Sequence, residues 1–206
     1  MNKVYIIGMG PGTADYLLPA ATKELERADC LIGSKRLLSL LPYKDKKMIR
    51  LKCRTDEAVS YIKKNREAER IAVLVTGDPG LYSFLLPIRK AFKEDEYTVI
   101  PGISSMQLAF ARIGDSWQDA KIISVHGRSK GNLAAEVKAN DKVFLFTDAK
   151  FPPDKIAGYL LENGVKKRRA VVFEELTYPT ERIVDTDLKT LSNMKGFGLC
   201  VMIIKK

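Results

Sequence analysis

The chain has 206 residues, of which 46% are hydrophobic and 29% are charged. This length and hydrophobic content suffice to bury a core in one large or two small domains, which excludes an intrinsically disordered chain. Lys and Arg number 35 against 25 Asp and Glu, a net charge of +10, so the surface should attract a polyanion such as RNA, DNA or a small molecule with many carboxylates.

Hydropathy and cysteine spacing restrict the location and the bound groups. No apolar run approaches the roughly 18 residues that span a membrane, and the N-terminus lacks the successive basic, apolar and cleavage regions of a secretory signal. Cys30, Cys53 and Cys200 are widely separated, and His126 is the only histidine. We therefore expect a soluble, cytoplasmic protein with reduced thiols and no metal bound by its side chains.

Strands and helices are predicted to alternate along the chain. Strand-like runs rich in Val, Ile and Leu occur at residues 3–8, 71–76, 97–100, 121–125, 142–147, 170–174 and 199–204. Helical patterns occur at residues 17–28, 56–67 and 105–113, and from Pro152 to a stop at Gly164. This alternation indicates an α/β fold with mostly parallel sheets and helices on their faces. Two basic runs, residues 44–54 and 166–169, read as solvated loops.

A domain boundary is predicted at the Gly-Asp-Ser-Trp sequence of residues 114–117. It follows a complete helical pattern and precedes a new series of strands. We therefore expect two α/β domains, residues 1–113 and 118–206. A cleft between two such domains is a common place for a ligand.

The first strand runs directly into a loop that contains Gly8, Gly10 and Gly12. Glycines there permit a tight turn and the close approach of a ligand, although an ordinary strand-to-helix turn gives the same pattern. A dinucleotide-binding loop needs glycine where Thr13 stands, and the Gly-Lys-Ser/Thr of a Walker loop does not occur. The loop is therefore better suited to a cofactor that carries no pyrophosphate.

Two more loops follow predicted strands, at residues 76–80 and 101–105. Open α/β sheets bind ligands at the carboxyl ends of their strands, so three glycine-bearing loops should share one edge. Asp78 could accept hydrogen bonds from a ribose or an amino group, or it could cap a turn. Ser104 could likewise contact a ligand or only cap the following helix.

The order and spacing of these loops resemble the tetrapyrrole (corrin and porphyrin) methylases over nearly the whole chain. The signature loops are Gly-Met-Gly-Pro-Gly at residues 8–12, Gly-Asp-Pro-Gly at 77–80 and Pro-Gly-Ile-Ser-Ser at 101–105. Residues 33–37, 101–112, 126–128 and 174–182 are similar to the branch that methylates carbon 5 of precorrin or cobalt-precorrin in cobalamin biosynthesis.

The resemblance implies an S-adenosylmethionine-dependent methyltransferase, with two α/β domains that hold the cofactor in a cleft, usually as a homodimer. It also implies the cofactor contacts, which carry over onto Met9, Gly10, Gly77, Asp78, Leu81, Ser104, Ser105, Thr147 and Leu176. Thr13 departs from the family, because many relatives carry Asp there. That departure leaves an acid role for this loop in doubt, since Asp15 belongs by default to the exposed start of the next helix.

The same resemblance suggests residues for a polycarboxylated tetrapyrrole such as cobalt-precorrin-6B or its metal-free counterpart. Arg128 and Arg36 could bind the ring's acetate and propionate groups, because guanidinium groups match carboxylates. His126 is the candidate catalytic base, since an imidazole exchanges its proton near neutral pH. The alternatives are a loop histidine bonded only to backbone and a solvated Arg36.

Two other functions remain open at this stage. An RNA ribose 2'-O-methyltransferase of the same fold would use the same loops and exploit the charge, although no aromatic-rich RNA-recognition signature occurs, so no nucleic acid is expected. A non-enzymatic basic binding domain is the third. The chain also lacks the further domain with which some relatives methylate and decarboxylate at carbon 15, so a separate protein is expected for those steps.

Overall fold

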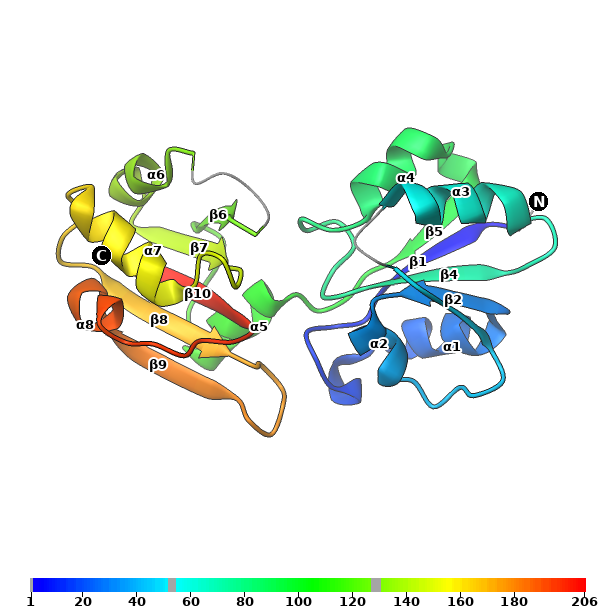
Figure 1. Ribbon diagram of the computed structural model, residues 1–206, viewed down its shortest axis with the longest axis horizontal. Coiled ribbons are helices and arrows are strands. Elements are labelled where there is room, and N and C mark those ends of the chain that lie inside the picture. Colours follow the sequence, from blue (N-terminus) through cyan, green and yellow to red (C-terminus); the bar gives the residue numbers. More distant parts are fainter. Residues whose placement is uncertain (1, 52–54, 127–130) are drawn as a thin grey trace. The chain divides into compact units, whose positions relative to one another are not determined.

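The computed structural model of the chain describes residues 2–51, 55–126 and 131–206. The chain folds into two compact units, Met1–Ser104 and Ser105–Lys206. In Figure 1 the first unit is coloured from blue to green and the second from green to red. Each unit has a five-stranded sheet and a hydrophobic core of its own.

The first unit alternates strands and helices, and it includes strands at residues 30–33 and 47–50 and helices at residues 35–39 and 85–91 that are not predicted from the sequence. Its elements are β1 (Val4–Gly8), η1 (Ala14–Tyr16), α1 (Pro19–Arg27), β2 (Cys30–Gly33), α2 (Lys35–Ser39), β3 (Lys47–Arg50), α3 (Thr55–Asn65), β4 (Ile71–Val75), α4 (Leu85–Ala91), η2 (Glu94–Glu96) and β5 (Tyr97–Ile100). The strands are all parallel, in the order β3-β2-β4-β1-β5. The α/β class is thereby confirmed.

Helices cover both faces of this parallel sheet. Leu25 of α1 and Leu37 of α2 pack in the cluster on one face, and Ile62 of α3 and Ile88 of α4 pack in the cluster on the other. Figure 1 shows the two helix pairs on opposite sides of the strands. Because β1 and β4 are buried on both faces, they read as continuous apolar runs in the sequence.

The chain changes direction between the neighbouring strands β1 and β4. β1 continues through α1 to β2, which lies beyond β4, whereas β4 continues through α4 to β5, which lies beyond β1. The two connections therefore leave the sheet in opposite directions. Open α/β sheets bind ligands at the carboxyl ends of strands at such a switch point, and two of the three glycine-bearing loops begin there.

Three glycines hold the loops of this edge together. A Cβ atom on Gly8 would lie 2.6 Å from the amide nitrogen of Gly102 and 2.7 Å from the carbonyl oxygen of Gly77. A Cβ atom on Gly102 would overlap the same Gly77 oxygen and lie 2.8 Å from the Cα of Gly8. The backbones following β1, β4 and β5 thus touch one another, at a distance that no larger residue permits.

The second unit has a mixed sheet. Its elements are α5 (Ser105–Arg112), β6 (Lys121–Ser124), α6 (Leu133–Ala139), β7 (Lys142–Phe146), α7 (Pro153–Glu162), β8 (Arg169–Glu174), β9 (Arg182–Asp187), α8 (Leu188–Ser192) and β10 (Cys200–Lys205). The strand order is β6-β7-β10-β8-β9. Among the described strands of this second sheet, only β6 and β7 pair in parallel. The expectation of mostly parallel sheets is wrong here, because β10 enters antiparallel between β7 and β8.

The structure divides before α5, whereas the sequence places the boundary after it, between residues 113 and 118. α5 packs on the second sheet, where the rings of Phe110 and Phe144 lie 6.2 Å apart. The segment after α5 is also tied to that unit, because the carboxylate of Asp115 accepts hydrogen bonds from Lys142 at 3.0 Å and Lys205 at 2.5 Å. These two ammonium groups lower the pKa of Asp115 to about 2.

The two basic runs are more structured than the solvated loops predicted from their charge. Residues 47–50 of the first run form the edge strand β3. In the second run, Arg168 is buried and donates to the carbonyl oxygens of Val137 and Asn140, at 2.8 and 3.1 Å, around the end of α6.

In the described part of the chain, no helix has the length and apolar character to cross a membrane.

We predict opposite effects for two substitutions of glycine by alanine. Gly102→Ala should lower the free energy of unfolding by about 1–3 kcal/mol or more, because the new methyl group meets rigid backbone. Gly158→Ala in α7, where a Cβ would meet nothing within 4 Å, should raise it by roughly 0.5–1 kcal/mol, because alanine favours a helix. Urea denaturation of both variants measures the difference, and equal effects would contradict the close packing of the loops.

Candidate functional site

The loops after β1 and β4 are joined by backbone hydrogen bonds. The amide of Met9 donates to the carbonyl oxygen of Val75, and the amide of Gly77 donates to the carbonyl oxygen of Gly10, both at 2.9 Å. Gly10 and Gly77 have φ angles of 71° and 68°, in the left-handed region that favours glycine. Met9, Gly10 and Gly77, three of the predicted cofactor contacts, therefore lie together at the carboxyl edge of the first sheet.

The glycines of the first loop also let backbone segments pack closely. The space beside Gly8 is filled by the loops after β4 and β5, and the space beside Gly10 by the carbonyl oxygen of Tyr16, 2.8 Å from the position of a Cβ. The missing side chains thus let backbone approach backbone. A ligand at this edge would meet the surface that the joined loops form.

Asp78 connects the second and third loops through both of its carboxylate oxygens. Oδ1 accepts from the amide of Gly80 at 2.8 Å, and Oδ2 accepts from the amide of Gly102 at 3.2 Å. The turn-capping alternative is therefore present in the structure. A ligand contact is compatible with it, because an ionised carboxylate has about four acceptor sites and these bonds use two.

The remaining predicted contacts of the first unit are close by in the chain. The amide of Leu81 donates to the carbonyl oxygen of Asp78 at 3.3 Å. Ser104 is buried, and its Cα would lie 3.5 Å from a Cβ on Gly77. Ser105 begins α5 and so belongs to the second unit. Tyr82, the next residue after Leu81, is 45% exposed and has a φ angle of 51°.

Arg36 reaches the same edge from α2. Its guanidinium donates to the hydroxyl of Thr76, directly after β4, at 2.7 Å. The sequence groups Arg36 with His126 and Arg128 as substrate residues. Arg36 thus lies beside the loops of the first unit, and Arg128 lies outside the described residues. Asp15 is exposed in η1, and Thr13 ends the first loop before it.

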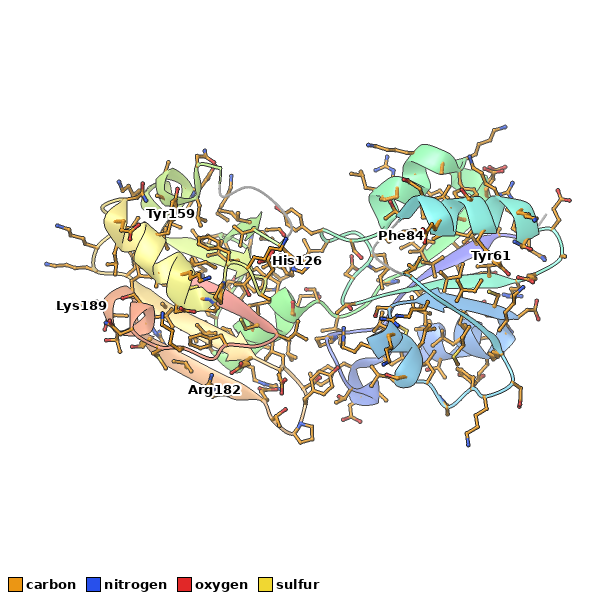
Figure 2. All side chains as sticks on the ribbon, viewed as in Figure 1. Tyr61, Phe84, His126, Tyr159, Arg182 and Lys189 are labelled. Carbon is orange, nitrogen blue, oxygen red and sulfur yellow. The ribbon has the colours of Figure 1, made fainter. Side chains whose placement is uncertain are left out.

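A second group of predicted residues lies at the carboxyl ends of β6 and β7. His126, labelled in Figure 2, follows β6. Its Nδ1 lies 3.2 Å from the carbonyl oxygen of Thr147, which follows β7. The hydroxyl of Thr147 donates to the carbonyl oxygen of Cys200 at 2.6 Å. Burial is the main reason that the pKa of the Cys200 thiol is raised to about 11, so this thiol stays protonated near neutral pH.

Leu176 lies in a strained loop after β8. It is buried, and its neighbours Glu175 and Thr177 have φ angles of 49° and 75°, unusual values for residues that carry a side chain. The carboxylate of Glu181 holds this loop, because it accepts from the amide of Thr177 at 2.6 Å and from Nε and Nη2 of Arg112 at 2.6 and 3.1 Å.

The bonds to Arg112 are the main cause that lowers the pKa of Glu181, with a smaller contribution from the amide of Thr177 and an opposing effect of burial. Sequence reasoning missed Arg112, Glu181, Thr76 and Cys200 as members of these groups. Local patterns cannot show which of these residues pair, because the partners are between 40 and 69 residues apart in the chain.

Comparison with known proteins identifies similar sequences and folds. The chain matches the family model of the Tetrapyrrole (Corrin/Porphyrin) Methylases over residues 3–192. It is 38% identical over 198 residues to a probable cobalt-precorrin-7 C(5)-methyltransferase of Methanocaldococcus jannaschii, and the match covers 92% of each chain.

Two solved structures share the fold. The cobalamin biosynthesis precorrin-6Y methylase of Archaeoglobus fulgidus superposes with a TM-score of 0.76 and 24% identity, over 99% of this chain and 98% of that one. A uroporphyrin-III C-methyl transferase of Thermus thermophilus, complexed with S-adenyl homocysteine, superposes with a TM-score of 0.77 and 18% identity, over 99% of this chain and 92% of that one. At these identities the two likenesses concern the fold alone.

We predict that Glu181→Gln lowers the free energy of unfolding at neutral pH by about 1.5–3 kcal/mol, the value of hydrogen bonds to a charged group. Since folding lowers the pKa of Glu181, the carboxylate stabilises the fold above the unfolded pKa of about 4.3. The difference from wild type should therefore shrink as the pH falls below that value.

Urea denaturation between about pH 7 and pH 3 measures this difference. The matched control is Glu162→Gln at the exposed end of α7, where a surface substitution should change the free energy by less than about 0.5 kcal/mol. A Glu181→Gln effect that is equally small at neutral pH would show that the pair with Arg112 does not hold the loop.

Proposed function

Because the chain belongs to the tetrapyrrole (corrin/porphyrin) methylases, we propose that it transfers a methyl group from S-adenosylmethionine to carbon 5 of a cobalt-precorrin or precorrin. One observation carries the proposal: three glycine-bearing loops meet at the switch point of the first sheet. The choice of carbon 5 is supported by the name of the Methanocaldococcus jannaschii relative, which the chain matches over nearly its full length.

We propose the carboxyl edge of the first unit as the site of the adenosyl cofactor. The amides of Met9 and Gly77 already bond within the loops, whereas the carboxylate of Asp78 keeps acceptor sites for ribose hydroxyls. The Thermus thermophilus structure, complexed with S-adenyl homocysteine, supports the same cofactor. We propose the following contacts in this chain: Met9, Gly10, Gly77, Asp78, Leu81 and Ser104 from the first unit, and Ser105, Thr147 and Leu176 from the second.

The task of the protein in this reaction is mainly orientation. S-adenosylmethionine supplies a methyl group that its sulfonium already activates. Asp78 and the joined loops would hold the cofactor in one position. Holding two reactants in line lowers the activation barrier by about 7–11 kcal/mol. A strained loop such as that around Leu176 suits the same purpose, because its backbone is fixed by Glu181 and Arg112.

The substrate residues are proposed from charge and position. Arg36 stands at the carboxyl edge of the first sheet, and Arg128 follows His126 in the sequence, so both could pair with carboxylates of a tetrapyrrole. Lys and Arg outnumber Asp and Glu, which favours the encounter with such a polyanion. The relative's name makes cobalt-precorrin-7 the substrate to test, rather than cobalt-precorrin-6B.

Three further properties belong to the proposal. A separate protein would methylate and decarboxylate at carbon 15, because the relative that the chain matches is named for carbon 5 alone.

A homodimer is proposed from the resemblance, and the exposed Ile183 on the edge strand β9 is a surface that a second copy could cover. A cytoplasmic location is proposed from the composition. Light scattering tests the oligomeric state, and fractionation of cells tests the location.

We predict that the protein adds one methyl group to cobalt-precorrin-7 at carbon 5 when it is incubated with methyl-labelled S-adenosylmethionine. Mass spectrometry gives the number of methyl groups, and carbon-13 NMR of the labelled product gives the position. Transfer to a ribose of RNA, with none to the corrin precursor, would overturn the proposal in favour of an RNA methyltransferase. Failure to bind any adenosyl cofactor would favour a non-enzymatic basic domain.

We predict that Asp78→Ala weakens S-adenosylhomocysteine binding by roughly tenfold to a hundredfold, the effect of losing hydrogen bonds to a carboxylate. The chain should remain folded, because the glycine contacts are intact. Isothermal titration calorimetry measures the affinity, and Asp15→Ala on the exposed η1 is the matched control that should bind normally. Unchanged affinity in Asp78→Ala would remove Asp78 from the site.

A further inference from the structure

His126 has a fixed partner although its side chain is exposed. Its Nδ1 lies 3.2 Å from the backbone carbonyl oxygen of Thr147, within the range of an N–H···O hydrogen bond. The label in Figure 2 shows the histidine in the second unit. The contact joins the ends of two adjacent parallel strands, β6 and β7.

The chemistry of this contact determines where the ring carries its proton. A carbonyl oxygen only accepts, so the two atoms form a hydrogen bond only when the hydrogen is on Nδ1. A neutral imidazole carries one hydrogen, which leaves Nε2 with a lone pair. The preference is the reverse of that of a free histidine side chain in water, where the Nε2–H tautomer predominates.

Hydrogen bonds to neighbouring strands fix the backbone around the carbonyl group of Thr147. The hydroxyl of Thr147 donates to the carbonyl oxygen of Cys200 on β10 at 2.6 Å, and only 7% of Thr147 is exposed. The amide of Val125 donates to the carbonyl oxygen of Phe146 at 3.0 Å, which fixes the residue before Thr147 against the residue before His126. Three strands therefore position one oxygen atom.

We propose that Thr147 holds His126 as the Nδ1–H tautomer, so that Nε2 is the proton acceptor of the methyl transfer. This inference rests on the proposed function. A carbon atom of the substrate forms a bond to the methyl group, the bond from that methyl group to sulfur breaks, and its electron pair stays on sulfur. The ring system then releases one proton, which Nε2 accepts to give an imidazolium. For the proton transfer Thr147 is a positioning residue, since it acts there through His126, in addition to the cofactor contact proposed above.

The tautomer can be measured without any substrate. Because the chain has one histidine, nitrogen-15 labelling of histidine in a protein free of a histidine tag gives signals from His126 alone. For the neutral ring, long-range proton–nitrogen correlation spectra should show a protonated Nδ1 and an unprotonated Nε2. A predominant Nε2–H form would overturn the proposal.

Variants of Thr147 test the positioning. Thr147→Ser keeps the hydroxyl that donates to Cys200 and should keep the Nδ1–H tautomer. Thr147→Val has nearly the same shape but lacks the hydroxyl, and it should move the nitrogen shifts toward those of a free side chain. Identical spectra for Thr147→Val and wild type would show that the hydroxyl does not position the carbonyl.

Turnover tests the role of Nε2. In His126→Asn, the side-chain amide can donate to the carbonyl oxygen of Thr147 in place of Nδ1, but no acceptor stands where Nε2 was. Turnover should fall by about 10²–10⁴-fold, the contribution of a general base, while S-adenosylhomocysteine affinity is unchanged. Turnover within threefold of wild type would overturn the acceptor role. If the wild type methylates no corrin precursor, the proposed function fails, whereas the tautomer measurement still decides the geometry.

Discussion

The contact of three backbones at Gly8, Gly77 and Gly102 is the constraint on which the first unit depends. Side chains larger than hydrogen would separate the loops after β1, β4 and β5, and the hydrogen bonds from Gly77 to Gly10 and from Gly102 to Asp78 require that the loops be adjacent. Since these loops stand at the switch point of a parallel sheet, their packing also sets the shape of the edge where such sheets bind ligands. Stability and the proposed cofactor binding would therefore depend on the same few atoms.

The second unit builds its candidate site with hydrogen bonds rather than with close glycine contacts. Thr147 links β7 to β10 and accepts from His126, while Glu181 links the loop around Leu176 to α5 through Arg112. In both cases a polar group with several bonds fixes a short segment of backbone at the end of a strand. Such fixed segments suit a reaction in which orientation contributes more than acid–base chemistry.

The sequence predicts the elements that depend on local patterns. The start of α7 at Pro153 and the left-handed Gly164 beyond its end agree with the structure, as do the strands around the three glycine-bearing loops. Features that depend on distant partners were predicted wrongly or missed. Arg168 sits in a basic run that reads as solvated, yet it is buried against the end of α6. The antiparallel entry of β10 was missed because a buried strand has the same apolar run in either direction.

Amide hydrogen exchange with and without S-adenosylhomocysteine tests most directly whether the joined loops bind the cofactor. The ligand should slow exchange at residues 9–10, 77–81 and 102–104. Exchange in α7 should not change and serves as the internal reference. A Cβ added at Gly158 of this helix would meet nothing within 4 Å. Slower exchange elsewhere with no change in these three loops would contradict the assignment of the cofactor site to the carboxyl edge of the first sheet.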